Sequence, residues 1–356
     1  MAQFYPLRVT DIKKETRDAV VVTLEPEESA AEHFDFVQGQ YLTFRRTFDG
    51  EELRRSYSLC SGVDEGLLRV GIKKVDDGWF SSFANDELKV GDTLDAMKPM
   101  GNFYIPVQPG AARRYLGFAG GSGITPFMSI IKTVLAAEPK STFTLVYGNR
   151  TVNSIMFREE LEDIKNTYMG RFNVIHMLET EAEIDLFSGR LTREKCDDLF
   201  DAWIDVEDAD VAFICGPEPM MLAIADALKA RGMDKDAIKF ELFASSRPAK
   251  AKQRAMNGET ADGGVCKATI ILDGVSTAVD VQKSGQSILE AALDAKLDVP
   301  FACKAGVCST CRAKVVEGEA EMETNYALED YEVERGYVLT CQCIPLSNKI
   351  VVDYDQ

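Results

Sequence analysis

The sequence has 356 residues, with 40 Lys or Arg against 58 Asp or Glu, so its formal net charge at pH 7 is −18. This length allows two or three domains with cores of their own, and the acidic balance argues against nucleic acid or an anionic membrane as a partner. Residues 1–30 lack the basic-then-apolar pattern of a signal peptide, and no apolar run approaches about 18 residues, so we expect a cytoplasmic protein.

Residues 1–108 are predicted to form an antiparallel β-barrel domain. Short β-branched runs alternate with turn signals such as Asp49-Gly50, a spacing typical of closed barrels. Within 54–58, an Arg, a Tyr and a Ser are expected to share one face of a strand, where they would offer a cation for phosphate, a ring for stacking and a hydroxyl. The segment 78–82, Gly-Trp-Phe-Ser-Ser, is expected to begin a short helix whose free N–H groups form a second anion site.

Residues 111–243 change to alternating strands and helices, which predicts a parallel-sheet α/β domain. A buried strand over 114–119 leads into Gly120-Gly-Ser-Gly-Ile-Thr-Pro126 and then a helix. This turn resembles the dinucleotide fingerprint, although Pro126 stands where its third glycine is expected. Thr125 is predicted as the N-cap and Pro126 as the first helical residue, so the helix N-terminus can receive a pyrophosphate.

Two further strand ends of this domain indicate a nucleotide site. The strand over 142–147 runs into Asn149 and Arg150, where an NAD-specific site would place an acid for the ribose hydroxyls. Because an Arg suits a 2′-phosphate, these residues favour NADPH, with NADH as the alternative. Cys215 and Gly216 end a later strand, at the edge where ligands bind in open parallel sheets; a small buried core residue is the other interpretation of Cys215.

A composition break follows Phe243. Residues 244–265 lack apolar periodicity and are predicted to be a flexible linker. Residues 266–356 are predicted to form a small β-rich domain with a hairpin at Asp273-Gly274 and a helix that begins with the capping box Ser287-x-x-Glu290.

The most specific motif lies in this last domain. Cys303, Cys308 and Cys311 form C-x4-C-x2-C, and Cys341 follows thirty residues later, which is the plant-type spacing of a [2Fe-2S] cluster. Two irons bridged by two sulfides still need two protein ligands each, hence four thiolates. Gly306 inside the loop is expected to let backbone N–H groups turn toward the sulfurs.

Other uses of these cysteines are weaker. A disulfide is disfavoured because nothing else in the chain indicates an oxidising compartment. A zinc site of Cys308, Cys311, Cys341 and Cys343 would leave Cys303 without a role and would need a gap longer than the roughly 15 to 20 residues of a zinc ribbon.

The two histidines exclude several oxygen-activating sites. Neither His33 nor His176 lies near the cysteines, so a Rieske centre is excluded, and neither follows a Glu at the Glu-x-x-His spacing of di-iron carboxylate sites. If the electrons of the cluster end in oxygen chemistry, another polypeptide must perform it.

Taken together, these segments resemble the ferredoxin–NADP reductase superfamily fused to a C-terminal plant-type ferredoxin. The phrases at 51–55, 147–151 and 322–328 are similar, more narrowly, to reductase subunits of bacterial phenylacetyl-CoA epoxidases, with the reductases of ketosteroid hydroxylases as relatives. The resemblance implies a β-barrel FAD domain, an NADP(H) domain and a β-grasp ferredoxin domain. It assigns Arg55, Tyr57, Ser58, Gly78, Ser81 and Ser82 to FAD; Gly120, Gly121, Gly123, Thr125, Cys215, Gly216 and Pro217 to the nicotinamide nucleotide; and Cys303, Cys308, Cys311 and Cys341 to the cluster. Asn149 and Arg150 join the nucleotide site on the argument given above, and Phe243 is a further candidate cofactor-binding residue.

The resemblance also implies a relay. Electrons would pass from NADPH to FAD, to the [2Fe-2S] cluster and to a separate di-iron oxygenase, with another aromatic or steroid oxygenase as the alternative acceptor. A diaphorase with a redox-sensing or structural cluster is the alternative of another class. Ser58 and Cys215 are expected to shape and tune the contact between nicotinamide and flavin and not to act as nucleophiles.

Overall fold

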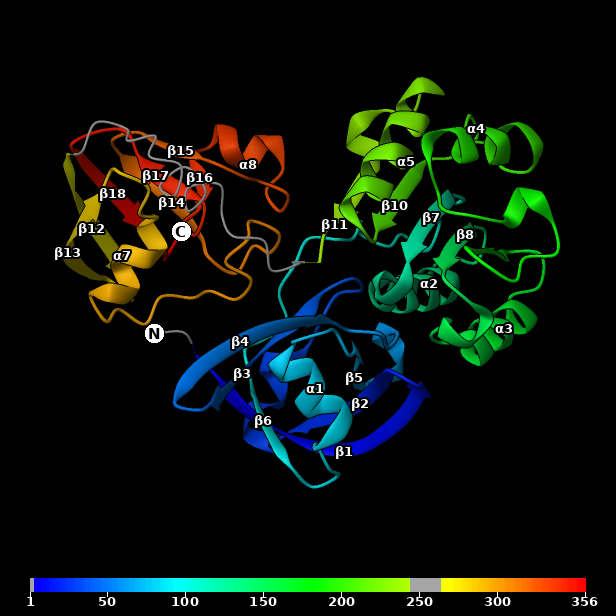
Figure 1. Ribbon diagram of the computed structural model, residues 1–356, viewed down its shortest axis with the longest axis horizontal. Helices are drawn as coiled ribbons and strands as arrows, with labels where there is room; N and C mark the ends of the chain where they lie inside the picture. The colour runs from blue at the N-terminus through cyan, green and yellow to red at the C-terminus, as the bar shows by residue number, and fades with distance from the viewer. Residues whose placement is uncertain (1–2, 244–263) are drawn as a thin grey trace. The chain divides into compact units, whose positions relative to one another are not determined.

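The computed structural model describes residues 3–243 and 264–356 (Figure 1). It separates into two compact units, Tyr5–Phe243 and one that contains residues 264–356. The predicted linker lies outside the described residues except for Gly264 and Val265. Among the described helices, none is long and apolar enough to cross a membrane.

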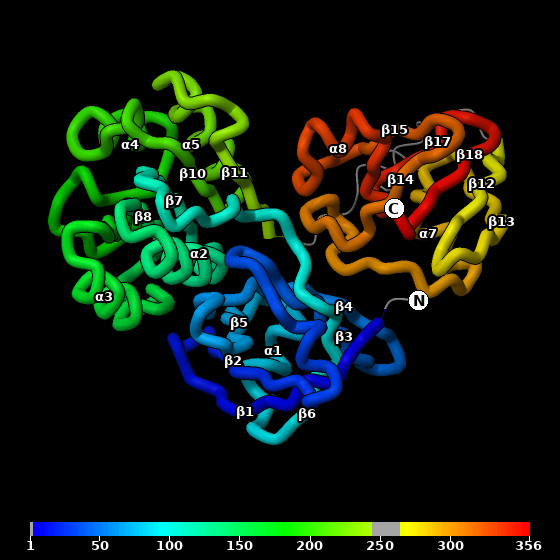
Figure 2. Tube along the Cα trace, turned by 180° about the vertical axis from the view of Figure 1, so that it is seen from behind, coloured from blue at the N-terminus to red at the C-terminus, as the bar shows by residue number. Residues whose placement is uncertain are grey.

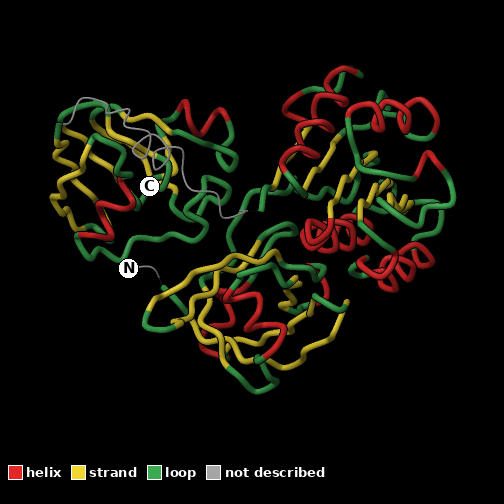
Figure 3. The backbone as a smooth tube through the Cα atoms, in the orientation of Figure 1, coloured by secondary structure: helices red, strands yellow, loops and turns green. Residues whose placement is uncertain are grey.

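The first part of unit Tyr5–Phe243 is an antiparallel barrel, as predicted. Its strands follow the order β4-β3-β6-β1-β2-β5, and a bridge between Leu59 and Val70 joins the two ends of this order. One α-helix, α1 (Trp79–Asp86), packs Phe80 and Phe83 into the barrel core, and Figure 3 shows it among the strands. The elements are β1 (Tyr5–Thr16), β2 (Ala19–Pro26), η1 (Glu28–Phe34), β3 (Tyr41–Phe48), β4 (Glu51–Ser58), η2 (Val63–Glu65), β5 (Leu68–Lys73) and β6 (Thr93–Ala96).

The second part is a five-stranded parallel sheet in the order β11-β10-β7-β8-β9. Helices α2 and α3 cover one face and α4 and α5 the other (Figure 2). Alternate residues of one strand serve the two faces: Tyr115 packs with α2, and Leu116 packs with α4 and α5. The elements are β7 (Arg114–Gly120), η3 (Gly121–Gly123), α2 (Ile124–Ala137), β8 (Thr142–Asn149), η4 (Val152–Ser154), α3 (Arg158–Thr167), β9 (Phe172–Leu178), η5 (Asp185–Phe187), α4 (Arg193–Ala202), β10 (Val211–Cys215), α5 (Glu218–Ala230), η6 (Lys235–Ala237) and β11 (Ile238–Glu241).

Barrel and parallel sheet share one hydrophobic core. Val21 and Phe103 of the barrel segment belong to the same buried cluster as Phe127 of α2. Ion pairs cross the same boundary, since the Arg69 guanidinium contacts the Glu160 carboxylate at 3.0 and 3.2 Å. The two parts are therefore held together as one body.

The C-terminal unit is a mixed sheet in the order β13-β12-β18-β14-β16, with β12 and β18 parallel and α7 packed against β13, which is the predicted β-grasp arrangement. The predicted capping box is confirmed, because Ser287 Oγ accepts the N–H of Glu290 while Glu290 accepts that of Ser287. The elements are β12 (Val265–Leu272), β13 (Val275–Gln282), α7 (Ile288–Asp294), β14 (Arg312–Glu317), β15 (Ala320–Met322), α8 (Asp330–Glu334), β16 (Tyr337–Leu339), β17 (Cys343–Pro345) and β18 (Lys349–Asp353).

Candidate functional site

Three polar side chains meet where the barrel faces the parallel sheet. Ser58, the last residue of β4, is 2% exposed and donates its hydroxyl hydrogen bond to Glu241 Oε2 at 3.1 Å. Glu241 ends β11 and lies in register with Cys215, which ends the neighbouring strand β10. Ser58 and Cys215, the two residues expected to shape the contact between nicotinamide and flavin, therefore both lie at the Glu241 carboxyl group.

Burial sets the protonation of this group. The Glu241 residue is partly exposed, but its carboxyl group is enclosed, and desolvation raises its pKa to about 8, against the opposing effect of the Ser58 hydrogen bond. Burial, and then the nearby Glu241 charge, raises the pKa of the Cys215 thiol well above its usual value. At neutral pH Glu241 thus carries a proton and Cys215 is a neutral thiol, which agrees with a shaping role for Cys215 and not a nucleophilic one.

Sequence reasoning missed Glu241. The residue belongs to none of the motifs named above and lies two positions before the composition break at Phe243. One signal could have indicated Glu241: it ends a parallel strand next to the strand that Cys215 ends. Ligands bind at that carboxyl edge of an open parallel sheet.

The predicted flavin strand differs in one respect from expectation. Arg55 is exposed and Tyr57 is half-buried, with the Tyr57 ring 5.5 Å from that of Phe80. Ser58 does not share their face, because consecutive strand residues alternate; it is buried, as is Arg54. The shared-face prediction is therefore wrong for Ser58, although the strand still presents Arg55 and Tyr57 together. Burial raises the pKa of Tyr57, so its phenol stays neutral.

The second predicted flavin segment is a tight turn into α1. The Ser81 hydroxyl donates to the Gly78 carbonyl at 3.0 Å and accepts the N–H of Val75 at 3.2 Å. A Cβ on Gly78 would lie 2.4 Å from Val75 Cγ2 and 2.5 Å from Ser81 Oγ, so a larger residue there would displace the Ser81 hydroxyl from the turn. The Ser81 side chain is thus used in building the turn. The Ser82 N–H donates to the Gly78 carbonyl at 2.8 Å, so the helical N–H groups that precede it, those of Trp79 to Ser81, are the ones left for an anion.

Two glycine-rich turns abut at the carboxyl edge of the parallel sheet. A Cβ on Gly123 would lie 2.3 Å from the Cys215 carbonyl oxygen, and one on Gly216 would lie 3.1 Å from Gly120 Cα. Gly121 has φ +54, a left-handed conformation that favours glycine. Pro217 is the N-cap residue of α5. Gly123 and Gly216 thus let the two turns pack backbone against backbone, whereas a Cβ on Gly121 would meet nothing within 4 Å.

The predicted cap of the next helix is wrong. Helix α2 begins at Ile124 with Gly123 as N-cap, so Thr125 lies inside the first turn, and its hydroxyl donates to the Ser122 carbonyl at 3.1 Å. The cause is η3, which runs directly into α2 and starts the helical conformation earlier than the Thr-Pro signal indicates.

The edge of β8 carries an unusual side chain. Asn149 is 7% exposed, and its amide makes no well-formed hydrogen bond among the described residues, although it lies beside the Tyr147 hydroxyl, whose pKa it lowers against the effect of burial. A buried amide without well-formed hydrogen bonds is costly, and a ligand that hydrogen-bonds to it would remove that cost. Arg150 is exposed beside it, and Phe243 ends the described segment, 36% exposed.

The four predicted cluster cysteines are in contact in series. Cys308 Sγ lies 3.1 Å from Cys303 Sγ, Cys303 also contacts Cys341, and Cys341 contacts Cys311. All nine cysteines are free thiols, so the disulfide alternative finds no support in the structure. No group of three or more His, Cys, Asp or Glu in the described ranges is arranged around a single ion. The four thiols supply the number of ligands that a binuclear centre needs, two for each iron.

Backbone geometry also fits such a cluster. The N–H of Ala305 donates to Cys303 Sγ at 3.3 Å. Gly306 has φ +73, and a Cβ there would lie 2.8 Å from the Thr324 carbonyl oxygen, so the loop requires glycine. Thiol contacts from Cys308 and Cys341, followed by the N–H groups of Ala305 and Val307, hold the pKa of Cys303 well below its usual value. The pKa values of the Cys308 and Cys341 thiols, which donate to Cys303, are raised in turn. The contact from the Ala305 N–H is the kind of backbone donation to sulfur that was expected of the Gly306 loop.

Cys343 differs from Cys341. Its side chain is fully buried in the core of the C-terminal unit, and burial raises the pKa of its thiol to about 12. Its position in β17 pairs it with Met322 of β15. Cys341, which contacts two other cysteines of the loop, is therefore the better fourth ligand.

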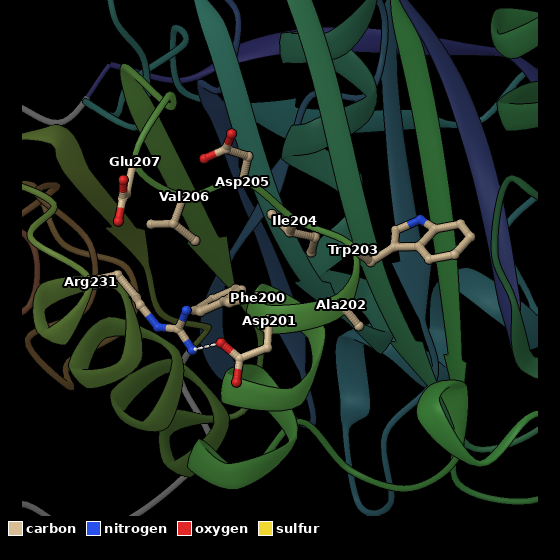
Figure 4. Close-up of a pocket in the computed structure, with 9 residues that line it drawn as sticks. All are labelled: Phe200, Asp201, Ala202, Trp203, Ile204, Asp205, Val206, Glu207 and Arg231. Carbon is tan, nitrogen blue, oxygen red and sulfur yellow. Dashed lines mark hydrogen bonds and ion pairs between the residues drawn. The ribbon is translucent and has the colours of Figure 1, made fainter.

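A cavity in the parallel-sheet part lies away from these groups. A cavity of about 330 Å³ between α4 and α5 contains none of the predicted residues, and the Arg231 guanidinium that lines it pairs with Asp201 at 2.7 Å (Figure 4).

The two histidines also lie away from these groups. His176 is partly buried in β9 beside Tyr147, and burial lowers its pKa. His33 packs on Tyr5 in the barrel, with ring centres 4.7 Å apart. Both histidines are therefore placed as structural residues.

Family models match three successive parts of the chain. An oxidoreductase FAD-binding domain matches residues 6–105, an oxidoreductase NAD-binding domain matches 118–226, and a 2Fe-2S iron-sulfur cluster binding domain matches 270–346. These matches follow the barrel, the parallel sheet and the C-terminal unit in order.

Two curated relatives match nearly end to end. The chain is 43% identical over 356 residues to one subunit of the 1,2-phenylacetyl-CoA epoxidase of Escherichia coli, covering 100% of this chain and 99% of the relative. It is 34% identical to the ferredoxin reductase component of 3-ketosteroid-9-alpha-monooxygenase of Mycolicibacterium smegmatis, and the match covers 98% of this chain and 97% of the relative.

Among solved structures, phthalate dioxygenase reductase has the same fold, with a TM-score of 0.59, 23% identity and 98% of each chain covered. An intact type IV self-sufficient cytochrome P450 monooxygenase contains a similar portion, with a TM-score of 0.73, 21% identity, and 98% of this chain but 41% of that chain covered.

Proposed function

Because the chain belongs to the family of oxygenase reductase components with FAD-, NAD- and 2Fe-2S-binding domains, we propose that it passes electrons from NADPH, through FAD and a [2Fe-2S] cluster, to a separate di-iron phenylacetyl-CoA epoxidase in the cytoplasm. Two features of the same chain support this most directly. Ser58 and Cys215 meet at the Glu241 carboxyl group, and the four thiols of Cys303, Cys308, Cys311 and Cys341 are in contact.

The first half of the relay concerns hydride. When bound, FAD takes two electrons as hydride from a nicotinamide and releases them singly. Tyr57 would present a neutral ring to the flavin, Arg55 would offer a cation to its phosphates, and the carboxyl edge of the sheet at Gly120 and Gly216 would face the nicotinamide. Because the barrel and the sheet share one core, both ring systems would be oriented by a single rigid body.

A hydride brings two electrons and no separate proton, so a proton is needed to neutralise the negative charge that the flavin gains, and Glu241 would supply it. With a pKa of about 8, its carboxyl group is protonated at neutral pH and can give that proton up within the working range. Ser58 follows Tyr57 in β4 and donates to Glu241 Oε2 at 3.1 Å, so its hydroxyl would relay the proton from Glu241 toward the flavin. Cys215 stays neutral and bounds the space on the nicotinamide side.

The nucleotide is proposed to be NADPH. Gly121, Gly123 and Thr125 surround the start of α2, where backbone N–H groups favour a pyrophosphate. Asn149 would hydrogen-bond the ribose, and exposed Arg150 would contact the 2′-phosphate. Measured kcat/KM values that favour NADH would refute this preference without touching the rest of the relay.

The second half is one-electron chemistry. Thiolates of Cys303, Cys308, Cys311 and Cys341 would hold the two irons, and the N–H groups of the loop would stabilise the negative sulfurs. Charge favours a cationic docking partner, because residues 317–334 carry many acidic side chains in the same unit.

A reconstitution assay tests the acceptor. The full chain, with NADPH and the oxygenase subunits of phenylacetyl-CoA epoxidase, should consume NADPH in proportion to phenylacetyl-CoA epoxidised. The 34% identity to a ketosteroid monooxygenase reductase makes a steroid oxygenase the second candidate, tested in the same way. Coupling to neither, with cytochrome c still reduced, would favour a diaphorase and refute the proposed partner.

A further inference from the structure

Trp79 is a large aromatic residue that the described structure leaves about half exposed. It is the first residue of α1, whose buried apolar residues are Phe80, Phe83 and Ala84. Trp79 lies off that face and is 47% exposed. Burial in the barrel core therefore does not account for an indole at this position.

The indole is nevertheless positioned. The Phe48 ring meets it edge to face, with centroids 5.9 Å apart and planes at 71°. Phe48 is itself fixed by the Phe83 ring at 6.0 Å and by the Arg46 guanidinium 5.6 Å from its centroid. One side of the indole is thus supported by a packed aromatic group, while about half of the residue's surface remains accessible.

The same aromatic row leads to the flavin strand. Centroid distances are 5.9 Å from Trp79 to Phe48, 6.5 Å from Phe48 to Phe80 and 5.5 Å from Phe80 to Tyr57. Tyr57 and Trp79 are the two ends of this row, and the first turn of α1, with its unbonded N–H groups, starts at Trp79. FAD has matching parts, since a pyrophosphate joins its isoalloxazine ring to an adenine.

We propose that Trp79 stacks on the adenine of FAD and so makes the site select FAD over FMN. The isoalloxazine ring would lie at Tyr57, the pyrophosphate at the first turn of α1 with Arg55 nearby, and the adenine on the accessible face of the indole. This assignment rests on the FAD-binding domain at residues 6–105 and does not depend on which oxygenase receives the electrons.

Flavin titration of the full-length apoprotein tests the assignment. Trp79→Ala should weaken FAD binding about tenfold or more, the range expected for loss of a base stacked on an aromatic ring. FMN binding should be unchanged, because FMN has no adenine. Trp79→Phe should keep most of the FAD affinity, and Trp79→Leu, which has bulk without a ring, should lose it. Equal losses for both flavins, or none for either, would overturn the proposal.

A fluorescence measurement gives an independent readout. The chain has two tryptophans, and the other one, Trp203, lies after α4 in the parallel-sheet part. In a Trp203→Phe background, all tryptophan emission comes from Trp79. Saturation with FAD should shield the residual emission from acrylamide quenching, whereas saturation with FMN should leave its accessibility close to that of the apoprotein. Identical shielding by FMN would contradict adenine stacking.

Discussion

Glu241→Gln tests the proposed proton donor. The amide keeps the size and the ability to accept a hydrogen bond from Ser58, but it cannot release a proton at the working pH. With a pKa of about 8, roughly nine-tenths of wild-type Glu241 is protonated at pH 7 and roughly one-tenth at pH 9. If the protonated form supports flavin reduction, the wild-type rate should fall about tenfold across this interval.

Stopped-flow flavin reduction by NADPH measures this directly. Glu241→Gln should be slower at pH 7, by about a hundredfold if general acid catalysis has its usual size, and its rate should be nearly independent of pH between 7 and 9. Matched absorbance spectra of the bound flavin would show that the site is intact. A wild-type rate that is flat over this range, or a variant that keeps the tenfold fall, would refute the role of Glu241.

Stability supplies a second measurement with a definite sign. The folded pKa of Glu241, about 8, lies above its ordinary value of 4.5, so the folded state binds the proton more tightly than the unfolded state. This contribution is fully present below about pH 4.5 and is lost as pH rises toward 8. At about 1.4 kcal/mol per pKa unit, the loss is at most roughly 5 kcal/mol. Glu241→Gln should therefore gain stability relative to wild type as pH rises from 5 to 8 in urea unfolding.

Three other substitutions test separate parts of the molecule. Cys341→Ser should abolish the visible absorption of the cluster while NADPH still reduces the flavin, whereas Cys343→Ser should keep that absorption; the reverse result would move the fourth ligand. Arg55→Ala should purify with little flavin, and a fully yellow protein would refute its phosphate role. The fully buried Glu138 carboxylate accepts hydrogen bonds from Gln108, Arg113, Tyr115 and Ser141. Glu138→Ala should therefore lower the free energy of unfolding by about 3–5 kcal/mol, measured as a lower urea midpoint. A loss under about 1 kcal/mol would contradict that reasoning.

Local sequence signals predicted what depends on local chemistry. The cysteine spacing and the Ser287 capping box depend on a few neighbouring residues, and the barrel and parallel sheet follow from strand periodicity. Thr125 failed as a cap because the preceding Gly121–Gly123 turn already had helical geometry. Glu241 was missed because its chemistry comes from burial against Ser58, which is 183 positions away in the chain, and no local pattern encodes that contact.

The shared core explains how that distant contact can be maintained. Ser58 belongs to the barrel and Glu241 to the parallel sheet, so their 3.1 Å hydrogen bond requires the two parts to stay fixed. Phe103 packs edge to face on Phe127 and on Phe213, joining the segment after the barrel to both α2 and β10. A hinge through this boundary would open close-packed aromatic contacts, at a cost of several kcal/mol. Hydride transfer is therefore better served by a preformed site that the nicotinamide enters than by closure of two separate domains.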